Sequence, residues 1–264
     1  MKVVAMTVLC VDFFEKQNLI CVGGNSVNFA TQCMKSGVGK ASLIGAVGTD
    51  TYGKAIIEYI DKRGIDRSHV FSKNGKTASN RILISENGDR YFPPDAWNGG
   101  VYQDFTLSEE DWIFALSHDI IAIPTNNNNF HETLKRVTPS NFLACDFLDM
   151  RNFDLMNETV PFMQLAFISG DDEVCTRMQM LSRKCNTLIT VTLGADGSRS
   201  FLKGIEYFTK AVEVKNITDT TGCGDAYQAA FTISYFKERN IEIALQAGSN
   251  AAAEILTHIG GVKV

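Results

Sequence analysis

The sequence lacks a long apolar run, and no stretch approaches the roughly 18 residues that a bilayer-spanning helix requires. It also lacks a basic excess: 25 Lys and Arg stand against 30 Asp and Glu, for a formal net charge of −5. An acidic chain is poorly suited to nonspecific binding of a phosphate backbone. Residues 1–5 are already apolar and no small-residue cleavage site follows them, so no signal peptide is expected. These absences argue against a membrane protein, a nucleic-acid-binding protein and a secreted protein.

Metal-binding and disulfide patterns are missing as well. The seven cysteines form no C-x-x-C pair, and the four histidines are scattered along the chain. An odd number of cysteines without ligand spacing predicts free thiols in a reducing cytoplasm rather than disulfides or zinc. What remains is a chain of 264 residues, 45% hydrophobic, which fits a globular protein with one α/β domain over residues 1–264.

Short apolar runs alternate with segments of helical period, the pattern of stacked βαβ units. The helix predicted at 52–63 is framed by Asp50 as its N-cap and Gly64 as its stop. Strands are predicted at residues 3–11, 42–47, 120–123, 142–145, 165–168 and 188–192, and helices at 25–36, 52–63, 108–116, 129–137, 172–183, 224–237 and 241–257.

Two segments interrupt this alternation. Residues 13–22 form a second β-like stretch near the start of the chain. Residues 77–92 predict a hairpin with Asn87 and Gly88 at its turn, because both central positions of a tight hairpin turn need a positive φ. Antiparallel strands inserted into a βαβ protein indicate a small flap or lid.

The most informative segment is 219–225, which reads Asp-Thr-Thr-Gly-Cys-Gly-Asp before a predicted helix. The backbone N–H groups of residues 222–225 have no intrahelical partners and lie at the positive end of the helix dipole, so they favour an anion such as phosphate. Asp225 beside such a site has two explanations. It caps the helix, or it is the base that takes a proton from an alcohol during phosphoryl transfer. The motif alone supports both equally.

Two other segments give weaker signals. Gly23 and Gly24 precede a helix on which Asn28 offers a donor and an acceptor to a polyol. Thr192 and Gly194 follow an apolar strand, at whose carboxyl end ligands bind in open α/β sheets. Taken alone, the first segment is better explained as a flexible link into a helix, and the second has an ordinary turn as its alternative explanation. P-loop, dinucleotide-binding and protein-kinase motifs are absent.

In this order and spacing, the segments resemble the ribokinase, or PfkB, family of carbohydrate kinases over nearly the whole chain. The resemblance implies a ribokinase-like α/β fold: a central, mostly parallel sheet flanked by helices, with a small β lid from about 13–22 and 77–92. Residues 10–12, 100–111 and 145–149 resemble the branch of the family that acts on fructoselysine. The matching blocks are Gly23-Gly24-x-x-x-Asn28, Val47-Gly48-x-Asp50-x-x-Gly53, Thr192-Leu193-Gly194-x-x-Gly197, Asp219-Thr-Thr-Gly-x-Gly-Asp225 and residues 247–253.

The resemblance also implies roles for individual residues. Asp225 would be the catalytic base, and the backbone around Gly222, Cys223 and Gly224 would hold the charge on the transferring phosphoryl group. ATP and Mg²⁺ are the implied cofactors, with a monovalent cation such as K⁺ in addition. The partners are a small sugar and ATP, with a homodimer through the lid. The implied contacts are Asp12, Gly23, Gly24 and Asn28 for the sugar, Thr192, Gly194 and Asn250 for the nucleotide, and Asp172 and Asp219 for cations.

The chain departs from the family pattern at three places. Thr7 and Val8 stand where most members have Gly-Asp or Gly-Glu. The Asn-x-x-Glu element that helps to hold Mg²⁺ falls on residues 169–173, where Asp172 is the in-register substitute and Glu173 its neighbour. These acids either hold the metal or stabilise the dipole of the predicted helix. Cys223 replaces the usual alanine, either as a reactive thiol or as a small buried filler.

The expected function is ATP-dependent phosphorylation of a primary hydroxyl of a ketose-like sugar, with fructoselysine first and fructose or ribose as alternatives. Two other hypotheses stay open: a kinase-fold binding protein that has lost activity, and a kinase for a nucleoside or a vitamin.

Overall fold

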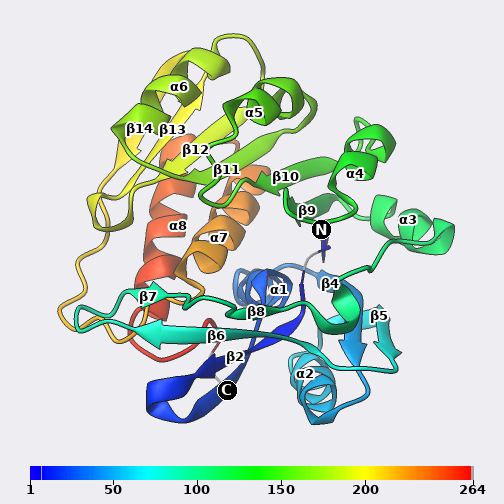
Figure 1. The fold of residues 1–264 in the computed structure, drawn as a ribbon. Helices are drawn as coiled ribbons and strands as arrows, with labels where there is room; N and C mark the ends of the chain where they lie inside the picture. Colours follow the sequence, from blue (N-terminus) through cyan, green and yellow to red (C-terminus); the bar gives the residue numbers. More distant parts are fainter. Residues whose placement is uncertain (7, 263–264) are drawn as a thin grey trace.

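The computed structural model describes residues 1–6 and 8–262 of the chain. Its main element is a nine-stranded sheet, of which one edge is an antiparallel hairpin and the rest is parallel (Figure 1). In spatial order the strands are β14 (Ile205–Thr209), β13 (Ser198–Leu202), β12 (Leu188–Thr192), β11 (Leu165–Ser169), β10 (Phe142–Asp146), β9 (Ile120–Pro124), β1 (Lys2–Ala5), β4 (Lys40–Gly48) and β5 (Asp66–Lys73).

Helices cover both faces of this sheet, which confirms the predicted fold class. One face carries α1 (Asn25–Lys35), α2 (Thr51–Lys62), α7 (Cys223–Glu238) and α8 (Ile241–Ile255). The other face carries α3 (Glu109–Leu116), α4 (Phe130–Arg136), α5 (Phe153–Thr159) and α6 (Asp172–Ser182).

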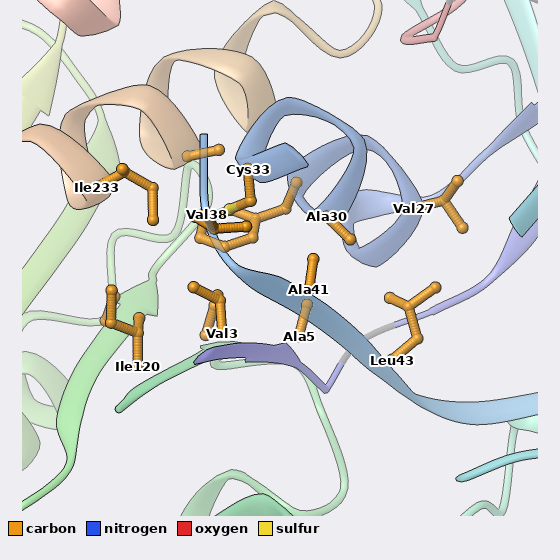
Figure 2. Close-up of a cluster of buried hydrophobic side chains, with 14 of the residues drawn as sticks. Val3, Ala5, Val27, Ala30, Cys33, Val38, Ala41, Leu43, Ile120 and Ile233 are labelled. Atoms are coloured by element: carbon orange, nitrogen blue, oxygen red, sulfur yellow. The ribbon is translucent and has the colours of Figure 1, made fainter. Parts of the chain in front are cut away.

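Strand β1 separates two hydrophobic cores. Val3 and Ala5 belong to one core and Val4 and Met6 to the other, because successive side chains of a strand point to opposite faces. Figure 2 shows the first core, where side chains of α1 pack onto β1 and β4. The helix α1 is thereby fixed on the sheet, and its first residues lie at the carboxyl end of β1.

A second, five-stranded sheet lies at one end of the large one (Figure 1). We call it the small sheet. Its strands include both segments that were predicted to form a lid, and they extend beyond the predicted boundaries. They are β3 (Leu19–Gly23), β2 (Cys10–Phe14), β6 (Ala78–Ile84), β7 (Arg90–Tyr91) and β8 (Trp97–Asn98).

The prediction of a single strand over residues 3–11 is wrong. Strand β1 ends at Ala5 in the large sheet, and β2 begins at Cys10 in the small one. Both halves are buried, so the apolar run continues across a change of sheet and periodicity cannot reveal the break. The Thr7 departure from the family pattern lies outside the described residues.

The hairpin predicted around Asn87 and Gly88 is present, since β6 and β7 pair antiparallel, but its tight two-residue turn is wrong. Gly88 has a φ of +87°, whereas Asn87 is not among the described residues with positive φ. The Ser85 carbonyl accepts from Gly88 N at 3.0 Å, and Ser85 N donates to the Asp89 carbonyl at 2.9 Å. The connection is therefore five residues long.

All seven predicted helices are present within two residues of their expected ends. Asp50 caps α2 by accepting from Gly53 N at 2.9 Å, and Gly64 follows that helix with a φ of +65°. The elements that the sequence pattern missed are β5, β8, α5 and the hairpin of β13 and β14. Of the helices in the described part of the chain, none is both long and apolar enough to cross a membrane.

Candidate active site

The predicted sugar-site residues meet where α1 and α7 begin. A small cavity opens there at the carboxyl ends of β1, β9 and β10, the edge at which open α/β sheets bind ligands. It is lined by Ala5, Asn25, Phe29, Ala122, Ile123, Pro124, Ala144, Asp146, Phe167, Asp225 and Gln228.

Asp225 lies in the first turn of α7 and is hydrogen-bonded to Asn28 of α1. Asn28 Nδ2 donates to Asp225 Oδ2 at 2.7 Å, which joins two motifs that are 197 residues apart in the sequence. Burial raises the pKa of Asp225, while the Asn28 hydrogen bond and the Arg90 guanidinium lower it. A carboxylate with a raised pKa and a partly open face is suited to take a proton from a bound hydroxyl.

Gly222 allows α7 to begin close to the chain end. Its φ is +78°, and a Cβ at this position would stand 2.3 Å from Gly261 Cα. The Cys223 N–H donates to the Thr220 carbonyl at 3.3 Å. Among the described residues, no backbone carbonyl accepts from the amides of Gly224 and Asp225. These two amides can therefore stabilise a negative group at the helix start.

Cys223 is a poor nucleophile in this position. Burial raises the pKa of its thiol, and this outweighs the lowering effect of Arg90. Since the thiolate is the reactive form, the interpretation of Cys223 as a small filler is better supported than that of a redox-active thiol.

Asp12 is a buried carboxylate on β2, with 5% of its surface exposed. Cys10 Sγ donates to Asp12 Oδ1 at 3.7 Å, and no other described residue donates to this carboxylate. Gly23 on the neighbouring strand leaves room for it, because a Cβ there would stand 2.0 Å from Asp12 Oδ2. Burial raises the pKa of Asp12 to about 7, and Arg90 opposes this rise.

Gly24 has a structural reason to be glycine. Its φ is +93°, and a Cβ there would stand 2.4 Å from the Val8 carbonyl oxygen. Gly23 and Gly24 thus let β3 and the start of α1 approach β2 closely, which brings Asn28 and Asp12 to the same site.

Asp146, at the end of β10, is a third carboxylate of this site that was not predicted as a site residue. It lines the cavity with Asp225, accepts from Leu148 N at 2.8 Å and is hydrogen-bonded to Gln228. Burial raises its pKa to about 6. Its place at the carboxyl end of an apolar strand was the signal available in the sequence.

Arg90 of β7 brings a positive charge to the three carboxylates. The guanidinium lowers the pKa of Asp12, Asp146 and Asp225. Its backbone is fixed to the 219–225 segment, because Arg90 N donates to Thr220 Oγ1 at 3.0 Å. Thr220 N in turn donates to the Gly88 carbonyl at 3.2 Å, so the small sheet contacts this motif directly.

A larger cleft of about 620 Å³ lies near the carboxyl ends of β11 and β12. Two cations, Arg199 and Lys210, and the Phe208 ring make it suitable for a phosphorylated aromatic ligand. Reasoning from sequence missed these three because the β13–β14 hairpin that carries them was not predicted. The lining residues are Gly170, Asp171, Asp172, Leu193, Ala195, Asp196, Arg199, Phe208, Lys210 and Ala211.

Of the three predicted nucleotide residues, Thr192 and Gly194 lie beside this cleft, and Asn250 is not among its lining residues. Gly194, with a φ of +60°, is flanked by lining residues on both sides. Thr192 Oγ1 is 3.2 Å from Ser169 Oγ, and the Thr192 carbonyl accepts from Gly170 N at 3.0 Å. Asn250 is exposed on α8 and accepts from Gln246 Nε2 at 2.9 Å. Their contacts with nucleotide stay predictions.

The two predicted cation ligands differ in their surroundings. Asp172 lines the cleft with 87% of its side chain exposed, 3.3 Å from Arg199. Both oxygens of Asp219 are bonded to protein donors, with Thr221 N at 2.9 Å and Thr221 Oγ1 at 2.7 Å on Oδ1, and Gly260 N at 2.8 Å on Oδ2. Within residues 1–6 and 8–262, no group of three or more His, Cys, Asp or Glu side chains is arranged to hold a metal ion.

Comparison with known proteins places these features in a family. The model of the pfkB family carbohydrate kinases matches residues 16–137 and 162–263. The chain is 31% identical to fructoselysine 6-kinase of Escherichia coli (strain K12) over 255 residues, which cover 95% of each chain. It is 25% identical to a fructosamine kinase of Bacillus subtilis (strain 168) over 262 residues, or 96% of this chain and 90% of the relative.

A solved structure has the same fold. The adenosine kinase from Sinorhizobium meliloti aligns with a TM-score of 0.82 over 100% of this chain and 96% of its own, at 17% sequence identity.

Proposed function

Since this chain belongs to the pfkB family of carbohydrate kinases, we propose that it transfers the γ-phosphoryl group of ATP to a primary hydroxyl of a ketose-like sugar. The first candidate substrate is fructoselysine, which would become fructoselysine 6-phosphate. Fructose and ribose are the alternatives. Asp225 is the general base in this proposal.

One observation carries the proposal: the 2.7 Å hydrogen bond from Asn28 Nδ2 to Asp225 Oδ2. This bond orients one carboxylate oxygen and leaves the other for an incoming hydroxyl. The amides of Gly224 and Asp225, which donate to no backbone carbonyl of the described residues, lie in the same helical turn, next to the base. Phosphoryl transfer to an alcohol needs both a general base and hydrogen-bond donors for the developing negative charge.

The relatives support the choice of fructoselysine among sugars. Two curated relatives carry the names fructoselysine 6-kinase and fructosamine kinase, and both align over at least 90% of their length. Asp12, Gly23, Gly24 and Asn28 are proposed to orient the sugar, as the proximity of Asp12 and Asn28 to Asp225 supports.

ATP is the phosphoryl donor of a kinase in this family, and the cleft of about 620 Å³ is its proposed site. Mg²⁺ is commonly held by one or two carboxylates together with substrate phosphates, and an exposed Asp172 in the cleft fits this manner of binding. The Mg²⁺ would neutralise charge on the phosphates. A monovalent cation at Asp219 remains part of the proposal, although both carboxylate oxygens already bind protein donors.

The small sheet is the proposed lid, and a homodimer through it is proposed as well. Four large apolar side chains on its strands are exposed: Leu19 (40%), Ile20 (47%), Tyr91 (46%) and Trp97 (45%). Exposed apolar groups gathered on one small sheet favour association with a second copy.

A substrate panel tests the function. Purified protein with ATP and Mg²⁺ is assayed for ADP release with fructoselysine, fructose, ribose, adenosine and pyridoxal, and the product is identified by mass. Asp225→Asn should lower the turnover of the best substrate by about 10²- to 10⁴-fold, as loss of a general base does, while ATP binding is retained. Near-normal turnover of this variant would remove Asp225 as the base. No phosphorylated product from any compound would favour a binding protein.

A further inference from the structure

Asp225 belongs both to the proposed sugar site and to the small cavity at the carboxyl ends of β1, β9 and β10. Asn28 binds it on the side of the sugar site, whereas the cavity wall includes Asp225 but neither Asn28 nor Asp12. A base that takes a proton from a bound hydroxyl must pass this proton on before the next turnover. The cavity therefore offers a route for the proton on a side of Asp225 that the sugar-orienting residues do not occupy.

This cavity is suited to hold a water molecule. The space open to water in it is about 20 Å³, and one water needs about 10–15 Å³ together with two to four polar partners. The polar side chains of the wall meet this need, and the rest of the wall is apolar. They are Asn25, Asp146, Asp225 and Gln228. A water in a space this small neighbours both carboxylates.

Asp146 is held beside Asp225 by α7 itself. Gln228, which is hydrogen-bonded to Asp146, follows Asp225 by three residues, so the two lie on one face of the helix. The other partner of Asp146 is Leu148 N, at 2.8 Å. Both partners are uncharged, and burial of a carboxylate without a bonded cation is costly. Bracing of the turn at Leu148 needs only an acceptor, which asparagine would supply as well, so the charge requires another explanation.

We propose that Asp146 is the second proton acceptor of the reaction, linked to Asp225 by a water in this cavity. As the sugar oxygen bonds to the γ-phosphorus and ADP leaves, the hydroxyl proton moves to Asp225. Asp225 then gives a proton to the water, which gives one of its own to Asp146, and Asp146 releases it to solvent. We call this path the proton relay. It rests on the proposed sugar-kinase function and deepens it.

The charges around the two carboxylates favour this transfer. Burial raises the pKa of both, that of Asp146 to about 6, so each holds a proton more readily than an exposed aspartate does. The charged groups that face Asp146 are Asp225 on α7, which raises its pKa, and Arg90 on β7, which lowers it. A proton can therefore pass between two groups of the same kind in similar surroundings.

Arg90 reaches this site from the small sheet. Its register partner on β6 is Ile84, four residues beyond Asn80, and Asn80 is the register partner of Asp12 on β2. Residues an even number of positions apart on a strand share a face, so Arg90 lies on the same face of the small sheet as Asp12. Its guanidinium lowers the pKa of both carboxylates of the relay, which favours the return of each to its ionised form.

A kinetic comparison of wild type and Asp146→Asn tests the relay. The asparagine keeps an acceptor for Leu148 N but cannot take the proton. Asp225 is ionised before the first turnover, so quench-flow should show a first turnover at nearly the wild-type rate, and kcat/KM for the sugar should be retained. The steady-state kcat should fall by about 10²-fold, the low end of the effect of losing a proton-transfer group. Asp149→Asn, at an exposed aspartate of the same loop, is the control and should keep the wild-type kcat.

Two small molecules of matched shape separate proton transfer from a structural role. In Asp146→Ala, formate can take the place of the missing carboxylate. Formamide has nearly the same shape and also accepts a hydrogen bond, but it is not a base. We expect formate to raise the kcat of this variant several-fold and formamide to leave it unchanged. Equal effects of the two, or no effect of either, would contradict the relay.

The outcomes separate this role from the function. A wild-type kcat in Asp146→Asn, or an equal fall of kcat and kcat/KM, would overturn the relay and leave a sugar kinase with Asp225 as its base. If the Asp146 variants do not fold, Ala144→Val fills the cavity and leaves both carboxylates in place. It should retain kcat/KM and lower kcat, and a wild-type kcat would overturn the relay. If the wild-type protein phosphorylates no sugar, the proposed function fails and the relay with it.

Discussion

Thr77 and Asp50 are joined by two hydrogen bonds: Thr77 Oγ1 donates to Asp50 Oδ1 at 2.5 Å, and Thr77 N donates to Asp50 Oδ2 at 2.9 Å. The same hydroxyl accepts from Gly48 N at 2.9 Å. Asp50 also caps α2, and Thr77 directly precedes β6. The family block at 47–53 therefore ties the small sheet to the large one.

Replacement of this hydroxyl should destabilise the fold. In Thr77→Val, the buried Gly48 N–H loses its acceptor and Asp50 Oδ1 keeps only the Gly53 N donor. The expected cost is about 1–3 kcal/mol in the free energy of unfolding. Urea denaturation at pH 7 measures this loss. Thr106→Val makes the same chemical change at an exposed threonine and should leave the midpoint nearly unchanged. Equal midpoints for the two variants would contradict the structural role of Thr77.

The pH dependence of this contact has a defined sign. Burial raises the Asp50 pKa, but hydrogen bonds from Thr77 and Gly53 outweigh it and the net shift is downward. A lowered pKa in the folded state gives stability that is present above the ordinary Asp pKa of about 4 and is lost as the pH falls below it. The stability difference between wild type and Thr77→Val should therefore narrow below about pH 4.

Asn28 should affect turnover through Asp225. In Asn28→Ala, Asp225 loses a hydrogen bond that both orients it and lowers its pKa. Hydrogen bonds to charged groups contribute about 1.5–3 kcal/mol, so kcat should fall by roughly 10- to 100-fold. Steady-state kinetics with the best substrate of the panel measures this fall. Gln32→Ala, on the same helix and without a hydrogen bond to Asp225, is the control, and an equal loss in both variants would point to a general disturbance of α1.

Arg90 should shift the pH profile. The guanidinium lowers the pKa of Asp225, so Arg90→Gln should raise that pKa and move the acidic limb of the kcat/KM profile to higher pH. Turnover on the acidic side should fall several-fold. The profile is measured from pH 5 to 9 at constant ionic strength, because the effect is electrostatic.

Arg81→Gln is the matched variant for Arg90. Arg81 is also an arginine of the small sheet, but it neighbours Asn80 and so lies on the opposite face, where it pairs with Glu15. Its loss should leave the acidic limb in place. The specific role of Arg90 would be contradicted if the acidic limb of the kcat/KM profile does not shift in Arg90→Gln. It would also be contradicted if the limb shifts equally far in Arg81→Gln.

The sequence was sufficient for features that depend on local chemistry. The cap at Asp50, the stop at Gly64 and the α7 start after Gly222 follow from side chains and φ preferences within a few residues. The proximity of Asn28 and Asp225 followed from the family resemblance, since no local pattern links residues 197 apart.

Features that depend on long-range pairing were beyond prediction. The side-chain directions of Asp12 and Arg90 follow from the registers of β2, β6 and β7, which pair segments far apart in the chain and cannot be read from a local pattern. The hairpin of β13 and β14 has a half-exposed outer strand without an apolar run, so its cations at the nucleotide cleft were missed. The passage of residues 3–11 from one sheet to the other was missed because burial in two different cores produces one continuous apolar signal.

Gly222 offers a test of how the chemistry depends on backbone geometry. Alanine in the left-handed region costs about 1–2 kcal/mol wherever it is introduced. Gly37 has a similar φ of +74° with nothing within 4 Å of an added Cβ, whereas at Gly222 the added Cβ would stand 2.3 Å from Gly261 Cα. Gly222→Ala should therefore lose about 1–3 kcal/mol more than Gly37→Ala, the usual cost of overpacking. Chemical denaturation of the two variants compares these losses directly. Relief of the contact with Gly261 must displace the start of α7. The kcat should therefore drop in Gly222→Ala and be retained in Gly37→Ala. An equal kcat in the two variants would mean that the position of this turn does not control the reaction.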